Sequence, residues 1–499
     1  MEVTFQNHGY DCLNPVVRQV LSSEQSQEIR LSEEMPDVGK ILAAWGQPIL
    51  RSKEWNGDAF GAACGMMVWV LYVPEDGSAE RCLDAWIPLQ LHFDLPEDDL
   101  PEGKICLGML PKPVEARSIS PRKIQVRAGL SLAAQAFVPM QIPVSLPQGL
   151  PEDVELLKST YPVRLLREAG EKIFQQEEIL ALPDSAPIPQ MLICYRAEPR
   201  VTDRKVLSQK LVFRGNTNVH LLYRCQEGQL HSWDFDIPFS QYTELEGEYG
   251  SEAQAEFTLC PTALELELDA DGRMNLKCAV AAQYVLSDRE QLEVIEDAYS
   301  PGREMTLQTG VLELPGILDS RREGVYAQQD VNAQAGLLVD TWFLPEYPRQ
   351  RREEAGVVLE QPGTFQTLYY GEDGALHGGA ARWDGTLSVP ADEKVDIWAA
   401  PMPAAPQAAI GGSSITAKAE LPMDLMAVAM ERLPVVTGLT LGQPRKPEAG
   451  RPSLILRRAG EKSLWEIAKA SNSTVCSIRE ANDLQGEPTP GQMLLIPIP

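Results

Sequence analysis

The sequence predicts a mainly β protein, in which tandem antiparallel β-sandwich or barrel-like domains precede a small α+β module of βααβ order. Three observations predict this fold class. A long pattern recurs at a spacing of about 150 residues, which suits whole domains and not solenoid repeats. Apolar and polar residues alternate inside the recurring segments, as they do in half-buried strands. Residues 453–499 instead show two short helical patterns between two strand patterns.

The recurring pattern defines three copies of one domain. The matching positions are Pro36 with Pro187, residues 40–45 with 190–195, Val70-Leu71-Tyr72 and Gly77 with Leu221-Leu222-Tyr223 and Gly228, and, more weakly, Leu368-Tyr369 and Gly374. We therefore divide the chain into consecutive segments. They are copy one at 1–150, copy two at 151–305, a divergent copy three at 306–441, a linker at 442–452 and a C-terminal module at 453–499.

Strand and turn signals dominate within the copies. Leu264, Leu266 and Leu268 alternate with glutamates before a turn that ends at Gly272, and alternation resumes afterwards, which predicts a β-hairpin. Asp-Gly pairs supply the positive φ that tight hairpin turns require, so Gly77 and Gly374 should lie in equivalent turns. A short helix is expected only at 151–158, where proline and acidic residues are typical of a first helical turn.

Charge and composition exclude several kinds of partner. The formal net charge is −27, and such a field repels phosphate backbones and anionic lipids, so we expect no nucleic-acid partner. The longest apolar run, Met66 to Val73, is shorter than the roughly 18–20 residues that span a bilayer. The first residues lack the basic and apolar regions of a signal peptide. We expect no direct membrane insertion and a cytoplasmic location, where the nine dispersed cysteines stay reduced.

The linker and the C-terminal module differ in composition from the copies. Residues 442–452 contain three prolines and two glycines, which predicts an extended spacer that keeps the module away from its neighbours. In the module, strands are expected near Leu454 and Leu494, and helices are expected after Ser463 and Ser473 as N-caps.

The module resembles a LysM domain. The residues that carry the resemblance are Gly460, Ser463-Leu464-Trp465, Ile467-Ala468, Ile478, Asn482, Leu484, Pro490-Gly491-Gln492, Leu494 and Ile496-Pro497. LysM domains bind polymers of N-acetylglucosamine through two loops, although this copy lacks the aromatic residue often found on the first strand. The resemblance implies a binding site for a protein or a glycan at Gly460, Glu461, Lys462, Ser463, Leu464, Trp465, Asn482, Leu484, Gln485 and Gly486. Trp465 either faces that ligand or belongs to the small core of the module.

Copy two resembles the SPOCS domain of spore-coat proteins. The resemblance lies in residues 206–215, residues 219–223 and the run Ile237-Pro238-Phe239-Ser240. Tandem SPOCS domains followed by one LysM domain are similar to the SipL-type family of spore-coat morphogenetic proteins. That similarity implies a partner like the coat-basement ATPase called stage IV sporulation protein A, and a location on the mother-cell side of the forespore surface.

Motifs for catalysis are missing from the sequence. The five histidines are dispersed, and neither a nucleophile elbow nor a phosphate-binding glycine loop is present. We therefore predict a non-enzymatic assembly scaffold without catalytic residues, cofactors or metal ligands. The alternative is a protein that binds peptidoglycan of the cell wall or spore cortex through its LysM-like module.

Overall fold

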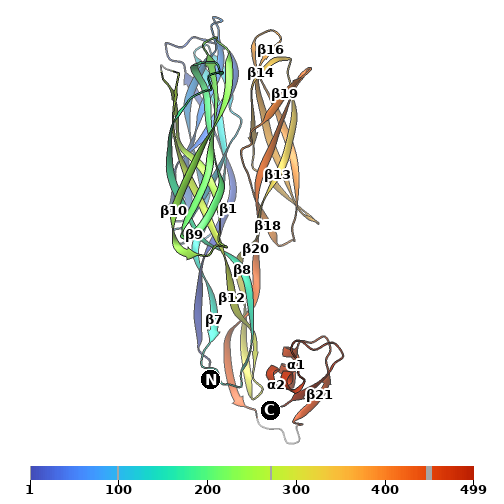
Figure 1. The fold of residues 1–499 in the computed structure, drawn as a ribbon. Coiled ribbons are helices and arrows are strands. Elements are labelled where there is room, and N and C mark those ends of the chain that lie inside the picture. The colour runs from blue at the N-terminus through green and yellow to red at the C-terminus, as the bar shows by residue number, and fades with distance from the viewer. Residues whose placement is uncertain (1, 98–99, 270–271, 446–451, 499) are drawn as a thin grey trace.

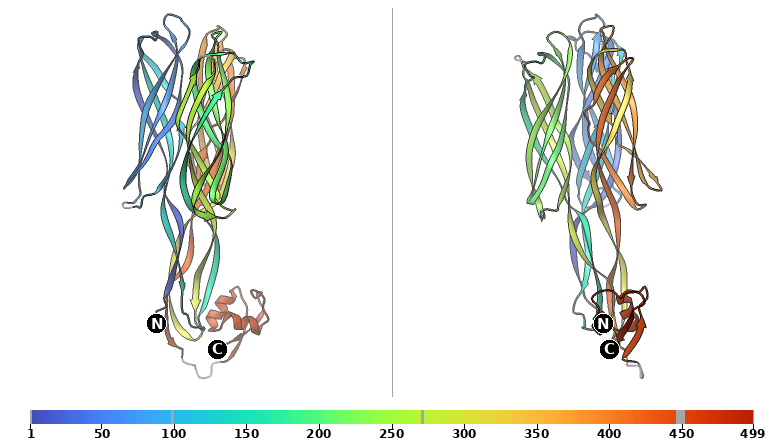
Figure 2. Two further views of the ribbon diagram at one scale, coloured as in Figure 1. Left: turned by 60° about the vertical axis from the view of Figure 1, so that its left-hand side comes forward. Right: turned by 45° about the vertical axis from the view of Figure 1, so that its right-hand side comes forward.

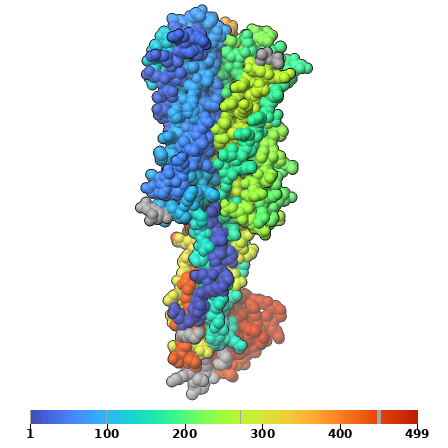
Figure 3. All heavy atoms as spheres, turned by 90° about the vertical axis from the view of Figure 1, so that its left-hand side faces the viewer, coloured from blue at the N-terminus to red at the C-terminus, as the bar shows by residue number. Residues whose placement is uncertain are grey.

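The protein has three β-rich heads above a long common stalk, with the C-terminal module at the foot of the stalk (Figure 1). The computed structural model describes residues 2–97, 100–269, 272–445 and 452–498. Each copy forms one head and contributes one pair of long strands to the stalk (Figure 2). The heads of copies one and two lie side by side in the space-filling view, and the module contacts the base (Figure 3).

Every copy consists of antiparallel strands in two sheets. Copy one contains β1 (Phe5–Arg30), β2 (Val38–Asn56), β3 (Ala59–Pro74), β4 (Arg81–Asp94), β5 (Lys104–Pro111), β6 (Glu115–Ser120) and β7 (Lys123–Pro147). Copy two contains β8 (Glu155–Leu180), β9 (Pro189–Cys225), β10 (Leu230–Tyr249), β11 (Gln254–Leu268) and β12 (Met274–Tyr299). Copy three contains β13 (Arg303–Asn332), β14 (Ala335–Pro345), β15 (Arg349–Glu353), β16 (Gly356–Gly371), β17 (Leu376–Pro390), β18 (Val395–Pro401), β19 (Gln407–Gly411) and β20 (Ser414–Pro444).

Each head is a β-sandwich around its own core, which confirms the predicted fold class. In copy one the sheet β1-β7-β5, with β6 beside β7, packs on the sheet β2-β3-β4. Copy two uses β11-β12-β8 and β10-β9, and copy three uses β13-β20-β18 and β14-β16-β15, with β19 and β17 at their sides. Fully buried aromatic residues mark the three cores, namely Phe60, Phe213 and Phe365.

The hairpin predictions are confirmed, whereas the predicted helix is wrong. Strand β11 pairs with β12, and Leu264 and Leu266 are buried as the alternation requires. Gly77 and Gly374 have φ of +69° and +77° in matching turns. Residues 151–158 form a turn followed by the start of β8, because Leu156 packs beside Val3 and Ala298 and pairs with Ala298 in strand β12. Tertiary packing thus overrides the local helix signal.

The stalk consists of the pairs β1 with β7, β8 with β12, and β13 with β20, away from the heads. One apolar seam runs between the three pairs and takes residues from each. Its buried members are Cys12, Ile142 and Val144 of copy one, Val163, Leu165, Leu292 and Val294 of copy two, and Leu312, Leu314 and Leu433 of copy three. Because a two-stranded ribbon by itself leaves both faces open to water and is only marginally stable, the seam requires all three copies.

The heads also meet around a common axis, which relates equivalent residues of the repeat. The residues directly before Tyr72, Tyr223 and Tyr369 are Leu71, Leu222 and Leu368, and all three are fully buried in one cluster. Trp45 of copy one and Trp342 of copy three contact each other in the same cluster, with ring centroids 4.8 Å apart. The three copies therefore pack as an internal trimer of similar domains.

The nine cysteines are all free thiols, as the sequence analysis expected. Only Cys476 is exposed, and seven others are fully buried. Burial raises the pKa of the Cys64 thiol to about 12, so this side chain stays protonated and behaves as a small apolar residue.

A buried histidine joins copies two and three. The Nδ1 atom of His220 lies 2.9 Å from Asp234 in the same copy, and its Nε2 atom lies 2.6 Å from Asp340 on β14 of copy three. His220 and Asp340 each have 6% of the side chain exposed. Burial alone lowers the pKa of His220, but the charge of Asp340 and hydrogen bonds to both aspartates outweigh that effect and raise it to about 9. His220 is therefore a buried cation at neutral pH.

This arrangement predicts that the protein loses stability between about pH 6.5 and pH 9. A pKa raised on folding stabilises the native state fully below the unfolded value of about 6.5, and the contribution disappears as the pH rises through the folded value. The contribution of His220 to the free energy of unfolding is at most about 3 kcal/mol. Urea unfolding, followed by tryptophan fluorescence, measures the free energy of unfolding of the wild type and of His220→Gln at pH 6 and at pH 9.5.

The stability of His220→Gln should depend much less on pH than that of the wild type. His231→Gln, which changes a histidine on β10 whose ring packs near Tyr223 of the same copy, is the matched control and should behave like the wild type. Equal pH dependence in His220→Gln and the wild type would contradict the prediction.

Candidate functional site

The C-terminal module has the predicted βααβ order and holds both helices of the described residues. Its elements are β21 (Leu454–Arg458), α1 (Leu464–Ser471), α2 (Val475–Ala481) and β22 (Met493–Pro497). Leu464, Ile467 and Ile478 are buried between the helices and the two-stranded sheet. In the described part of the chain, no helix has the length and apolar character needed to cross a bilayer.

The helix caps agree with the sequence at one helix and differ at the other. Ser463 caps α1, and its hydroxyl and backbone N–H form a capping box with Glu466. These hydrogen bonds, from the backbone N–H first and the hydroxyl second, lower the pKa of Glu466. Thr474, not Ser473, caps α2 by accepting a hydrogen bond from the backbone N–H of Ser477 at 3.0 Å. Ser473 is fully buried and donates its hydroxyl to the carbonyl of Pro497 instead.

The two predicted binding loops lie next to each other. Gly460, Glu461, Lys462 and Ser463 are exposed between β21 and α1, whereas Gln485 and Gly486 are exposed after α2. The backbone N–H of Leu464 donates to a carboxylate oxygen of Glu487 at 2.7 Å and so links the two loops. These six positions are therefore accessible, and their role in binding stays a prediction.

Three other predicted site residues have structural contacts. The amide of Asn482 donates to the carbonyls of Ile478 and Leu495 at 2.7 and 2.6 Å and accepts from the N–H of Leu495 at 2.7 Å, so it fastens α2 to β22. Leu464 is fully buried, and Leu484 packs against the same core. These side chains shape the loops without being free to bind a ligand.

Trp465 connects the module to the stalk. Its indole N–H donates to Asp297 of β12 at 2.8 Å, and its ring meets Tyr299 edge to face at 4.8 Å. Lys469, one turn later on α1, lies 2.7 Å from both carboxylate oxygens of Asp297. Neither end of this contact could be paired from sequence, because Asp297 and Trp465 lie 168 positions apart.

Tyr299 completes the contact from the stalk side. Only 6% of Tyr299 is exposed, and its hydroxyl donates to the carbonyl of Ser473 at 2.9 Å. Burial is the main reason why the pKa of this phenol is raised. The expectation that the module stands clear of its neighbours is therefore wrong, since aromatic packing and a charge-assisted pair hold it on the stalk. Of the expected spacer, residues 442–444 belong to β20, and residues 446–451 lie outside the described residues.

We predict that Asp297→Ala loosens the module from the stalk. The change leaves the half-buried indole N–H of Trp465 without its acceptor, which shifts the docking equilibrium by about 1–2 kcal/mol, roughly tenfold. Hydroxyl-radical footprinting with mass spectrometry measures the result as faster oxidation of Tyr299 and Trp465. Glu461→Ala removes an exposed acid of the module and should leave both rates unchanged. Wild-type protection of Tyr299 in Asp297→Ala would refute the docking contact.

Comparison with known proteins identifies one part of the chain. Residues 190–262 match the family model described as SipL, SPOCS domain. This segment covers β9 and β10 and reaches into β11, the strands that give copy two one sheet and part of the other. No curated protein and no solved structure matches the chain. Residues 190–262 of copy two are therefore similar to the SipL SPOCS domain, which supports a SipL-like family for this protein and a role related to sporulation.

Proposed function

We propose that the protein is a non-enzymatic scaffold of spore-coat assembly at the forespore surface, on its mother-cell side. Its C-terminal module docks on a coat-basement ATPase similar to stage IV sporulation protein A, and the three heads provide surfaces for further coat proteins. The SPOCS match in copy two is the observation that carries the proposal. The shape supports it, because heads and module lie at opposite ends of the stalk (Figure 1).

The outer face of the β21–β22 sheet suits a protein partner. Leu454 and Leu456 on β21 are 50% and 62% exposed, and Met493 and Leu495 on β22 are 47% and 38% exposed. Leu456 pairs directly with Leu495, so these side chains form one apolar surface. The helices cover the opposite face through Leu494 and Ile496. A contiguous exposed apolar surface of this kind is typical of interfaces between proteins.

The same surface favours a protein over a glycan as the ligand. Sugars bind through polar groups and flat aromatic rings, and the exposed face of the sheet has neither beyond Arg458. The indole of Trp465, the aromatic residue of the predicted site, contacts Asp297 and Tyr299 of the stalk. We therefore propose the ATPase as the ligand and keep peptidoglycan as the alternative that the experiment must test.

The double substitution Leu456→Ser with Leu495→Ser tests the proposal in the full chain. Both side chains are exposed, so the fold should persist while binding to the purified ATPase weakens at least tenfold through loss of apolar contact. Biolayer interferometry measures binding, and circular dichroism monitors the fold. Ile119→Ser, which changes an exposed apolar residue of copy one, is the matched control.

Two outcomes would overturn the proposal. The first is undiminished binding of the double variant to the ATPase. The second is retention of the wild type on purified peptidoglycan sacculi together with no affinity for the ATPase, which would move the function to the glycan alternative.

A further inference from the structure

A cavity of about 190 Å³ lies where the three heads meet. Three equivalent prolines line it, Pro48 of β2, Pro199 of β9 and Pro345 of β14, each at the same distance before Tyr72, Tyr223 or Tyr369. Because proline has no N–H, none of the three strands can donate a backbone hydrogen bond at this position. The volume far exceeds the about 10–15 Å³ that one water molecule requires.

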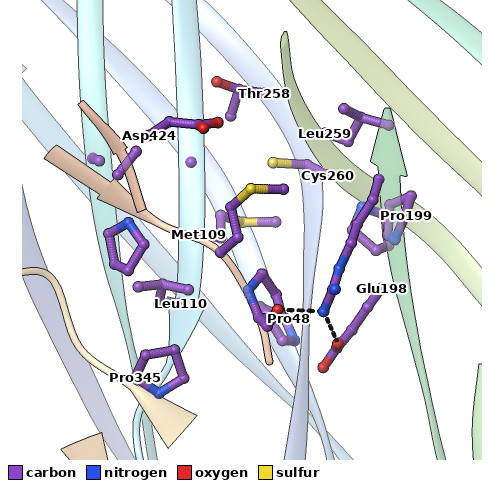
Figure 4. Close-up of a pocket in the computed structure, with 18 of the residues that line it drawn as sticks. Pro48, Met109, Leu110, Glu198, Pro199, Thr258, Leu259, Cys260, Pro345 and Asp424 are labelled. Carbon is purple, nitrogen blue, oxygen red and sulfur yellow. Dashed lines mark hydrogen bonds and ion pairs between the residues drawn. The ribbon is translucent and has the colours of Figure 1, made fainter. Parts of the chain in front are cut away.

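The three copies contribute unequally to the charge of the lining, although the repeat is roughly threefold. Copy one contributes no charged residue to it and offers Pro48, Met109 and Leu110. The charged residues all come from copies two and three; they are Arg196, Glu198, Arg200, Arg204, Arg322 and Asp424. In the view of Figure 4, Glu198 and Pro199 lie across the cavity from Leu110 and Pro345. The cavity is therefore amphipathic.

A comparison of the three copies shows that the fold does not require Arg196 or Arg200, which we call the two inner arginines. Counted back from Tyr72, Tyr223 and Tyr369, which places Pro48, Pro199 and Pro345 together, Arg196 is equivalent to Trp45 and Trp342; this alignment is one residue on from the match of residues 40–45 with 190–195. Arg200 occupies the position of Ile49, which is fully buried in copy one. Apolar side chains are thus compatible with the backbone at both places. The positive charge is a property of copy two alone.

The charges in the lining do not balance. Arg322 makes two hydrogen bonds with Asp424, at 2.6 and 3.1 Å, and Arg204 makes two with Glu256, at 2.8 and 2.9 Å. Arg196 and Arg200 instead share Glu198, at 3.7 and 3.3 Å. Glu198 is thus shared by two guanidinium groups, although the charge of Arg196 also acts on Asp234.

The two inner arginines also have unused donors. Among the described residues, the buried Nε atom of Arg200 has no hydrogen-bond partner, and that of Arg196 has only its ion pair with Glu198 at 3.7 Å, which is too long for a hydrogen bond. A second nitrogen of Arg200 donates to the carbonyl of Pro403. Leaving a charged donor unpaired away from water is unfavourable, so an anion placed here would gain both charge and hydrogen bonds.

We propose that this axial cavity binds a small amphipathic carboxylate. Its carboxylate lies between Arg196 and Arg200, and its apolar body contacts Pro48, Met109 and Leu110 of copy one. Such a ligand touches more than one copy and therefore stabilises the trimeric packing of the heads by linkage. This site is independent of the module and of the proposed docking on the ATPase.

Titration calorimetry on the full wild-type chain with benzoate, benzamide and inorganic phosphate tests the proposal. Benzoate has both the ring and the carboxylate, benzamide has the ring without the charge, and phosphate has the charge without the ring. We expect benzoate to bind at least tenfold more tightly than either of the others and to raise the thermal unfolding midpoint. The proposal is overturned if the wild-type chain does not bind benzoate, or if it binds benzamide or phosphate as tightly as benzoate.

Arg200→Ile places in copy two the residue that copy one already has at this position. It should fold, as circular dichroism can check, and weaken benzoate binding at least tenfold. Arg432→Gln, on the stalk, should bind benzoate like the wild type. Undiminished binding by Arg200→Ile would exclude this arginine as the anion ligand and overturn the assignment.

Discussion

The apolar seam of the stalk is the contact on which the rest of the molecule depends. A ribbon of two strands is marginal in water, and each fully buried valine or leucine contributes about 1.5–3 kcal/mol. Val163, Leu292 and Leu312 gain that burial only because ribbons from different copies meet. The seam thereby fixes the heads side by side above it, and it holds the end of β12 where Tyr299 can receive the C-terminal module.

Local patterns were sufficient for the hairpins but not for the way in which the copies associate. Leu264 and Leu266 alternate with glutamates over a few residues, so the strand and its buried face could be predicted. In each long pair a β-bulge lies between head and stalk, at Pro15/Val17, Leu286/Ser287 and Ile317/Asp319. The local alternation of apolar residues does not say which copy a strand faces beyond that point. The acidic turn after Pro151 was misleading for a similar reason, since the partners that hold Leu156 extended, Val3 and Ala298, are distant in sequence.

The candidate site shows the same division between local and distant information. The cap at Ser463 and the two exposed loops followed from short motifs, whereas the roles of Asn482 and Trp465 depend on groups outside those motifs. An asparagine that binds backbone and one that binds ligand look alike in a sequence. Likewise, a tryptophan on a short helix does not reveal whether its indole N–H meets a partner protein or, as here, Asp297 of the same chain.

Joining three similar domains in one chain has a consequence for what the axis can hold. A homotrimer of identical subunits must repeat every axial residue three times, so an arginine there would face two others and be repelled by them. In a single chain the equivalent positions can diverge, and Arg196 can stand beside Trp45 and Trp342. Covalent connection thus permits broken symmetry, in which copy two has an arginine where copies one and three have a tryptophan.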